Sequence, residues 1–108
     1  MIHELRIYRI APGKMAAAQE RFENVVLRYW ETYGIRPLAF WTVLVGQSNL
    51  DLYYLLEWES LAEREDRWTA FSTDPAFRRD MAESEKDGVL VAQVTNTLLA
   101  PTRFSPLR

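Results

Sequence analysis

Apolar residues recur every two residues in some parts of the chain and every three to four residues in others. The order of these parts restricts the possible fold more than any other feature of the sequence. Residues 2–10 alternate with period two, as the two faces of a β-strand require. After Pro12 and Gly13, apolar residues recur at helical steps over about 14–33. Gly34 follows this stripe and is well placed as a C-terminal helix cap. The first quarter of the chain therefore predicts a strand and then a long amphipathic helix.

The next part of the chain predicts a β-hairpin that begins just after Pro37. Residues 38–45 and 52–58 are rich in aromatic and β-branched side chains, and they flank the polar turn Gly-Gln-Ser-Asn. Both runs carry apolar residues on both sides of the predicted strand. We therefore expect these two strands to be covered on both faces.

A second helical region and a last strand follow. Ser60 and Glu63 have the spacing of a capping box, which predicts a helix start. Its predicted buried stripe consists of Leu61, Arg64 or Glu65, Trp68 and Phe71, and the charged run from Glu63 to Arg67 is expected on the solvent side. Asp74 and Pro75 restart the helix as N-cap and first helical residue, Gly88 ends it, and residues 89–99 predict a strand.

The resulting order, β-α-β-β-α-β, predicts a ferredoxin-like α+β domain with an antiparallel sheet. Right-handed crossovers place both helical regions on one face of the sheet and leave the other face bare. A bare apolar face of four strands is larger than a soluble monomer usually exposes. We therefore expect a homodimer, in which two sheets pack face to face as an α/β barrel. The alternative is a monomer whose strand aromatics are simply large core residues.

Composition limits the classes of function. The 108 residues fit one domain, 1–108, and 13 Lys and Arg against 15 Asp and Glu give a net charge of −2, which does not favour nucleic acid or an anionic membrane. The absence of Cys and the single His argue against thiolate chemistry and against a metal site within one chain. We expect no metal and no cofactor. The start of the chain lacks the apolar stretch of a signal peptide, so a cytoplasmic location is expected.

The motifs along the chain resemble those of the NIPSNAP family. In order, they are Glu4-Leu5-Arg6-x-Tyr8, Pro12-Gly13-Lys14, Tyr33-Gly34-Ile35, Phe40-Trp41-Thr42, Leu52-x-Tyr54-Leu55 and Glu59-Ser60-Leu61-Ala62-Glu63-Arg64. The resemblance extends from Ile2 to about Asp80. It implies a dimeric α/β barrel, within a superfamily that includes cofactor-free monooxygenases, haem-degrading enzymes, lactone isomerases and polyketide cyclases. It implies no single activity.

Three polar residues on the first strand are the candidate catalytic group. Glu4, Arg6 and Tyr8 alternate with apolar residues and therefore share one face. In one hypothesis Arg6 binds a carboxylate or enolate oxygen, Tyr8 donates a hydrogen bond, and Glu4 or Glu57 moves a proton. In the other, a buried Glu4–Arg6 or Arg6–Glu57 ion pair fixes the dimer register. The sequence leaves open which sheet face meets the helices.

Aromatic residues supply candidate ligand contacts. Trp41, Tyr54 and Trp58 are candidates for an apolar slot between helices and sheet, together with Glu4, although such residues are more often core. The polar ends of Tyr54 and Trp58 need partners, which favours a place beside a cavity. His3, near the chain start, is expected in solvent or at the dimer contact.

Two functions follow from these candidates. The first is a cofactor-free enzyme acting on an aromatic or enolisable substrate, with Arg6 and Tyr8 as anchors and Glu57 as base. The second is a non-catalytic dimeric module that binds a hydrophobic small molecule or a partner protein. Arg6→Leu is predicted either to abolish ligand binding with the dimer intact, or to weaken the dimer by leaving a buried glutamate unpaired.

Overall fold

A computed structural model describes residues 1–108 and contains one antiparallel sheet. The strands are β1 (Ile2–Ile10), β2 (Arg36–Thr42), β3 (Asp51–Trp58) and β4 (Val91–Leu99). Their order is β2-β3-β1-β4, so β1 and β3 are central, and every neighbouring pair is antiparallel. This confirms the predicted β-α-β-β-α-β arrangement.

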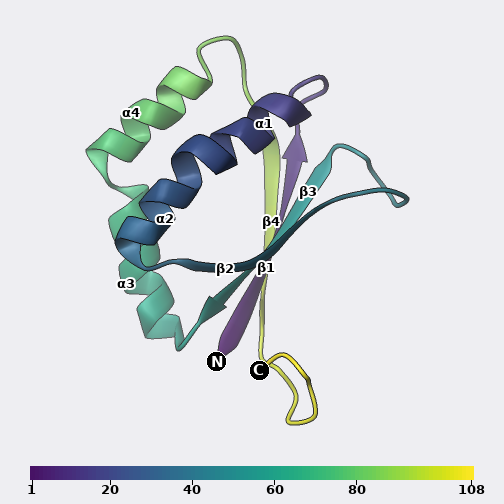
Figure 1. The fold of residues 1–108 in the computed structure, drawn as a ribbon, viewed down its shortest axis with the longest axis vertical. Coiled ribbons are helices and arrows are strands. Elements are labelled where there is room, and N and C mark those ends of the chain that lie inside the picture. Colours follow the sequence, from purple (N-terminus) through teal and green to yellow (C-terminus); the bar gives the residue numbers. More distant parts are fainter.

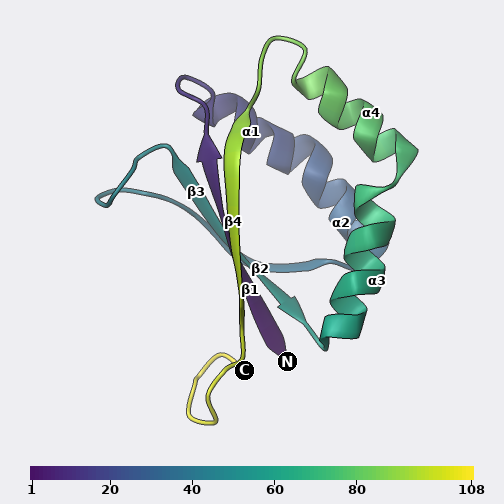
Figure 2. The same cartoon turned by 180° about the vertical axis from the view of Figure 1, so that it is seen from behind.

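The helices form one layer on one face of this sheet (Figures 1 and 2). The first crossover consists of α1 (Met15–Arg21), the π-helical turn η1 (Phe22–Val26) and α2 (Leu27–Tyr33), which together occupy the single predicted helix. Tyr33, the last residue of α2, is followed by Gly34, whose φ of 71° confirms the predicted left-handed C-terminal cap. None of the helices is both long and apolar enough to cross a membrane.

The second crossover consists of α3 (Leu61–Ser72) and α4 (Pro75–Ser84), and both predicted caps are present. The Ser60 Oγ accepts a hydrogen bond from the Glu63 amide at 3.0 Å, and Asp74 accepts from the amides of Ala76 and Phe77. The predicted buried stripe is wrong at its first position, because Leu61 is 61% exposed. Leu61 is the first residue of α3, so its side chain lies at the exposed end of the helix.

Strand β2 begins earlier and ends earlier than predicted. Pro37 lies inside the strand rather than before it, and the pairing with β3 shifts between Pro37 and Ala39. An edge strand tolerates proline because one side of its backbone needs no ladder partner. Leu44 and Val45 were predicted to be in the strand, but they lie in the loop that follows and are 96% and 98% exposed.

The strand register decides which side chains meet the helices. Glu4 pairs with Leu56 and Arg6 with Tyr54, and all of these side chains lie on the helix-covered face. The core there is apolar and aromatic: Ile10, Ala18, Phe22, Val26, Trp30, Ile35, Leu52, Tyr54, Leu56, Trp58 and Phe71. The opposite face, with Leu5, Ile7 and Leu55 at its centre, has no helix over it (Figure 2).

Candidate functional site

A single carboxylate lies at the centre of a polar network under the helix layer. The Glu4 side chain is fully buried, and it accepts hydrogen bonds from Arg6, Arg64, Asn96 and Trp58 at distances of 2.8–3.1 Å. Arg64 on α3 binds both carboxylate oxygens, at 2.8 and 3.0 Å. Burial by itself raises the pKa of Glu4, but the hydrogen bonds from Arg64 and Asn96 and the charge of Arg6 outweigh it and lower the pKa to about 2. Glu4 is therefore a permanent anion that joins α3 to the sheet, and it is unsuited to moving protons.

The Arg6 guanidinium connects this carboxylate to a pair of phenols. Its Nη1 donates to Glu4 at 3.0 Å and its Nε donates to the Tyr54 hydroxyl at 2.6 Å. The guanidinium carbon lies 4.5 Å from the centre of the Trp68 ring, within cation–π range. Burial lowers the pKa of Arg6, but the nearby Tyr54, Tyr8 and Glu4 outweigh it and raise the pKa, so the positive charge is fixed. No hydrogen bond within the chain uses Nη2.

Two tyrosines extend the chain of hydrogen bonds away from Arg6. Because the Tyr54 hydroxyl accepts from Arg6, its own proton is directed to the Tyr8 oxygen, 2.7 Å away. Burial, and then the neighbouring Tyr8, raise the pKa of Tyr54 well above its ordinary value of 10.0. The Tyr8 hydroxyl donates to no group of the chain. We call this chain of hydrogen bonds, from Arg6 through Tyr54 to Tyr8, the relay. It ends in the free Tyr8 hydroxyl, whose strength as a donor is increased by the positive charge of Arg6.

Tyr8 borders an inner cavity between the sheet and the helices. The cavity holds about 190 Å³. Its lining is mostly apolar and consists of Tyr8, Arg21, Phe22, Val26, Trp30, Trp68, Phe71, Ser72, Phe77 and Met81. An apolar chamber with a phenol at one wall is typical of a site for a small molecule with one polar end.

Most of the predicted site residues are brought together, but two are not. Glu4, Arg6, Tyr8, Tyr54 and Trp58 lie on the helix-covered face and are linked by hydrogen bonds.

Glu57 and Trp41 lie on the opposite face. Glu57 pairs in register with His3 and contacts Arg36 at 3.5 Å, and Trp41 pairs with Tyr53. Successive residues of a strand point to opposite faces, so neither can reach a ligand beside Arg6. The Arg6–Glu57 ion pair is excluded for the same reason, whereas the Glu4–Arg6 pair is present at 3.0 Å. It faces the helices, so it does not lie on the bare face where a dimer register would be set.

Sequence reasoning did not assign Arg64, Trp68 or Asn96 to this network. Arg64 was one of two candidates for the buried stripe of its helix, although it also falls in the charged run expected on the solvent side. It lies four residues before Trp68 and therefore shares that residue's inward face. Trp68 covers the Arg6 guanidinium, and Asn96 reaches Glu4 from β4. The helical spacing of Arg64 and Trp68 was the available signal, whereas Asn96 depends on the register of β1 against β4 and has no local signal.

His3 is not in solvent in this chain. It is 5% exposed, lies on the same face as Glu57, and its buried Nε2 has no hydrogen-bond partner. No group of three or more His, Cys, Asp and Glu side chains is placed to hold a metal ion.

The sheet order and the single helix layer define a ferredoxin-like α+β protein with a polar cluster between helices and sheet. The family model of NIPSNAP matches residues 3–106. The chain belongs to the NIPSNAP family, and the resemblance of its motifs is thereby confirmed. No curated protein matches it.

Solved structures agree with this assignment. A NIPSNAP family protein from Agrobacterium tumefaciens is 27% identical, with a TM-score of 0.83 over 99% of this chain and 98% of the other. An uncharacterised NIPSNAP-like domain protein from Burkholderia xenovorans is 23% identical, with a TM-score of 0.84 over 97% and 88% of the two chains. An antibiotic biosynthesis monooxygenase shares the fold at 13% identity, with a TM-score of 0.60 over 94% and 99%.

Proposed function

We propose that this chain binds a small aromatic or enolisable molecule in the inner cavity and stabilises negative charge on one of its oxygen atoms. The observation that carries the proposal is the relay of hydrogen bonds from Arg6 through Tyr54 to Tyr8, a residue that lines the cavity. A donor that is supported by a buried cation and borders a mostly apolar cavity is suited to stabilise an oxyanion.

The size and charge of the site support a single-ring anion. A cavity of about 150 Å³ lined by aliphatic and aromatic side chains is large enough for benzene, and this cavity holds about 190 Å³. Two arginines, Arg6 and Arg64, surround one carboxylate, Glu4, so the network carries an excess of one positive charge. A ligand oxygen with negative charge at Tyr8 offsets that excess.

As an enzyme, the chain would act without a cofactor, in the manner of a monooxygenase or isomerase that proceeds through an enolate or phenolate. Tyr8 would donate its hydrogen bond to the developing oxygen anion, and Arg6 would act through Tyr54. Neither Glu57, on the other face, nor Glu4, with its saturated carboxylate, can serve as the base. The substrate would have to ionise by itself or transfer its proton to water.

The second candidate function is a non-catalytic module that binds a hydrophobic small molecule or a partner protein. One observation favours it: neither a carboxylate nor an imidazole lines the inner cavity. Proton abstraction usually needs such a group within hydrogen-bond reach of the substrate. Ligand binding through Tyr8 without turnover in air or in deuterated water would favour this module.

The test compares benzoate with benzene, by calorimetry or NMR titration, on the wild type and on Tyr8→Phe. A hydrogen bond to a charged group contributes about 1.5–3 kcal/mol, so Tyr8→Phe should weaken benzoate binding by about 10- to 150-fold and leave benzene binding unchanged. Tyr53→Phe removes the same hydroxyl from the bare face and is the matched control. Equal benzoate affinity in the wild type and Tyr8→Phe contradicts the proposal.

We further propose a second copy of this chain as the partner that covers the bare sheet face. Leu5, Ile7 and Leu55 lie at the centre of that face, and Trp41 and Leu99 at its edges are 49% and 43% exposed. Exposed apolar side chains that gather on one sheet face, here flanked by Thr95 and Thr97 of β4, are typical of an interface.

Sedimentation should therefore give twice the mass of one chain, and Leu55→Arg should convert the protein to a monomer. Leu61→Arg changes an exposed leucine at the start of α3 and should leave the assembly unchanged. A wild type that sediments as a monomer at micromolar concentration contradicts this proposal.

A further inference from the structure

We infer that Phe22 divides one ligand site into two chambers and sets the largest ligand that the inner chamber accepts. The inference deepens the proposed function, which supplies the role of the inner cavity. The second chamber of this ligand site is a groove that the proposed function does not use.

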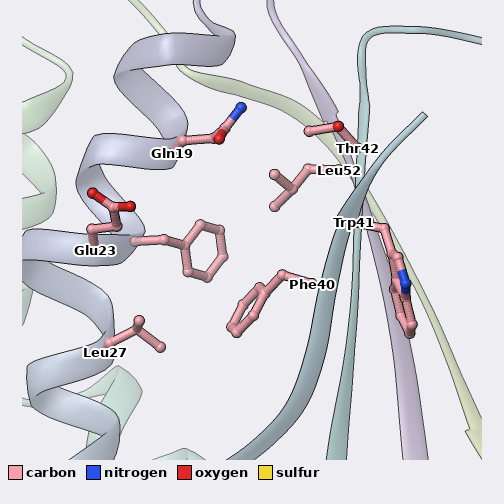
Figure 3. A pocket seen from close by; sticks show the side chains of 8 residues that line it. Gln19, Glu23, Leu27, Phe40, Trp41, Thr42 and Leu52 are labelled. Carbon is pink, nitrogen blue, oxygen red and sulfur yellow. The ribbon is translucent and has the colours of Figure 1, made fainter. Parts of the chain in front are cut away.

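The outer chamber is an open groove of about 400 Å³ between the first crossover helix and the edge strand β2. Figure 3 shows Leu27, Phe40 and Leu52 pointing into this space, with the polar ends of Gln19 and Glu23 at its rim. Trp41 lies on the other side of the strand (Figure 3). The groove therefore combines an apolar floor with an edge that is open to water.

Phe22 is the one residue that lines both chambers. Phe22 is 7% exposed, and its ring packs against those of Tyr54 at 5.3 Å, Phe40 at 5.5 Å and Tyr8 at 5.8 Å between ring centres. Tyr8 belongs to the inner chamber and Phe40 to the outer one. The Phe22 ring therefore forms the partition between them.

The backbone at this position differs from the rest of the helix. Phe22 is the first residue of the π-helical turn η1, which continues to Val26 and interrupts the α-helical hydrogen bonding of α1 and α2. Such single turns occur mostly inside α-helices and frequently at functional sites. The wider turn places Phe22 and Val26 on the inner chamber, with Leu27 on the outer groove.

The class of ligand follows from this partition. With Phe22 in place, the inner chamber accepts one aromatic ring. A ligand with two fused rings must either displace the Phe22 ring or remain in the outer groove. The joined chambers, about 400 and 190 Å³, together reach the range of sites for drug-sized molecules.

The experiment measures the ratio of naphthalene affinity to benzene affinity in the wild type, Phe22→Leu and Phe22→Ala. Neither probe has a hydroxyl, so the result does not depend on recognition by Tyr8. Phe22→Ala should raise the ratio about tenfold, because a second ring becomes buried, and Phe22→Leu should raise it less. Phe22→Leu also guards against loss of folding, since Phe→Ala in a core is strongly destabilising.

Methyl NMR locates the probe. Of the two chambers, Met81 lines only the inner one and Leu27 only the outer one, so naphthalene bound to Phe22→Leu should shift the methyl signals of both residues. Phe40→Leu enlarges the outer groove without opening the partition and is the matched control.

The inference is overturned if neither Phe22 variant raises the ratio, or if Phe40→Leu raises it as much. Failure of the proposed function gives a different result, namely benzoate binding that does not depend on Tyr8.

Discussion

Neutralising the buried carboxylate by Glu4→Gln should remove a defined part of the stability of the protein. The pKa of Glu4 is about 2 in the folded chain, compared with an ordinary value of 4.5. At about 1.4 kcal/mol per pH unit, this difference corresponds to about 3 kcal/mol in favour of the folded state. Because the folded pKa is the lower one, this contribution is complete above about pH 4.5 and is lost as the pH falls toward 2.

The assay is urea unfolding of the wild type and Glu4→Gln at pH 7, 5 and 3, at one protein concentration, followed by tryptophan fluorescence. The variant should be less stable by about 3 kcal/mol or more at pH 7, since two arginines lose their counter-ion. The difference should narrow at pH 3. Glu83→Gln, at an exposed pair with Lys86, is the control and should change stability by less than about 0.5 kcal/mol. A Glu4→Gln variant with wild-type stability at pH 7, or with the same pH dependence, would refute the reasoning.

Two further predictions concern the helix ends. Asp74→Ala removes an acceptor used by the amides of Ala76 and Phe77, and it should lower the free energy of unfolding by about 1 kcal/mol in the same urea assay. Gly34→Ala places a Cβ at a φ of 71°, where it also meets the end of the Arg67 side chain, and should lower the unfolding temperature through a cost of about 1–2 kcal/mol. Gly13→Ala, at a similar φ but in open space, is the matched control for the contact with Arg67. If Gly13→Ala lowers the stability as much as Gly34→Ala does, the contact with Arg67 contributes nothing to the cost.

The order of elements was predictable because each boundary has a local signal. Ser60, Asp74 and Gly34 mark helix ends through hydrogen bonds and φ values that involve only their near neighbours. Boundaries without such a signal were less accurate. The strand β2 was predicted to begin just after Pro37, yet Pro37 lies inside the strand, because an edge strand has a free side that needs no donor.

The sequence predicted only some of the residues that form the candidate site. Alternation along β3 already separated Tyr54 and Trp58 from Glu57, and alternation along β1 grouped Glu4 with Arg6. Local patterns do not show which of the two alternating sets of side chains on β3 lies on the same sheet face as Glu4 and Arg6 of β1. That depends on the pairing of Arg6 with Tyr54, which are 48 residues apart in the chain.

Hydrogen-bond partners from distant parts of the chain explain why Glu4 and Arg6 lie on the helix-covered face of the sheet. A buried Glu4 and Arg6 are costly beneath helices unless every charge has a partner. Arg64, 60 residues away, and Asn96, 92 residues away, supply those partners from α3 and β4. The network is therefore possible only once the sheet and the helix layer have assembled, and no short segment of the sequence predicts it.

These contacts also separate the two predicted results of Arg6→Leu. Glu4 retains both hydrogen bonds from Arg64 and those from Asn96 and Trp58 when Arg6 is removed, so the carboxylate is not left unpaired. Arg6 faces the helices, and its loss leaves the bare sheet face unchanged. Arg6→Leu should therefore preserve the assembly state in sedimentation and weaken benzoate binding at least as much as Tyr8→Phe. A change of assembly state with unchanged benzoate affinity would assign Arg6 to the interface and remove it from the ligand site.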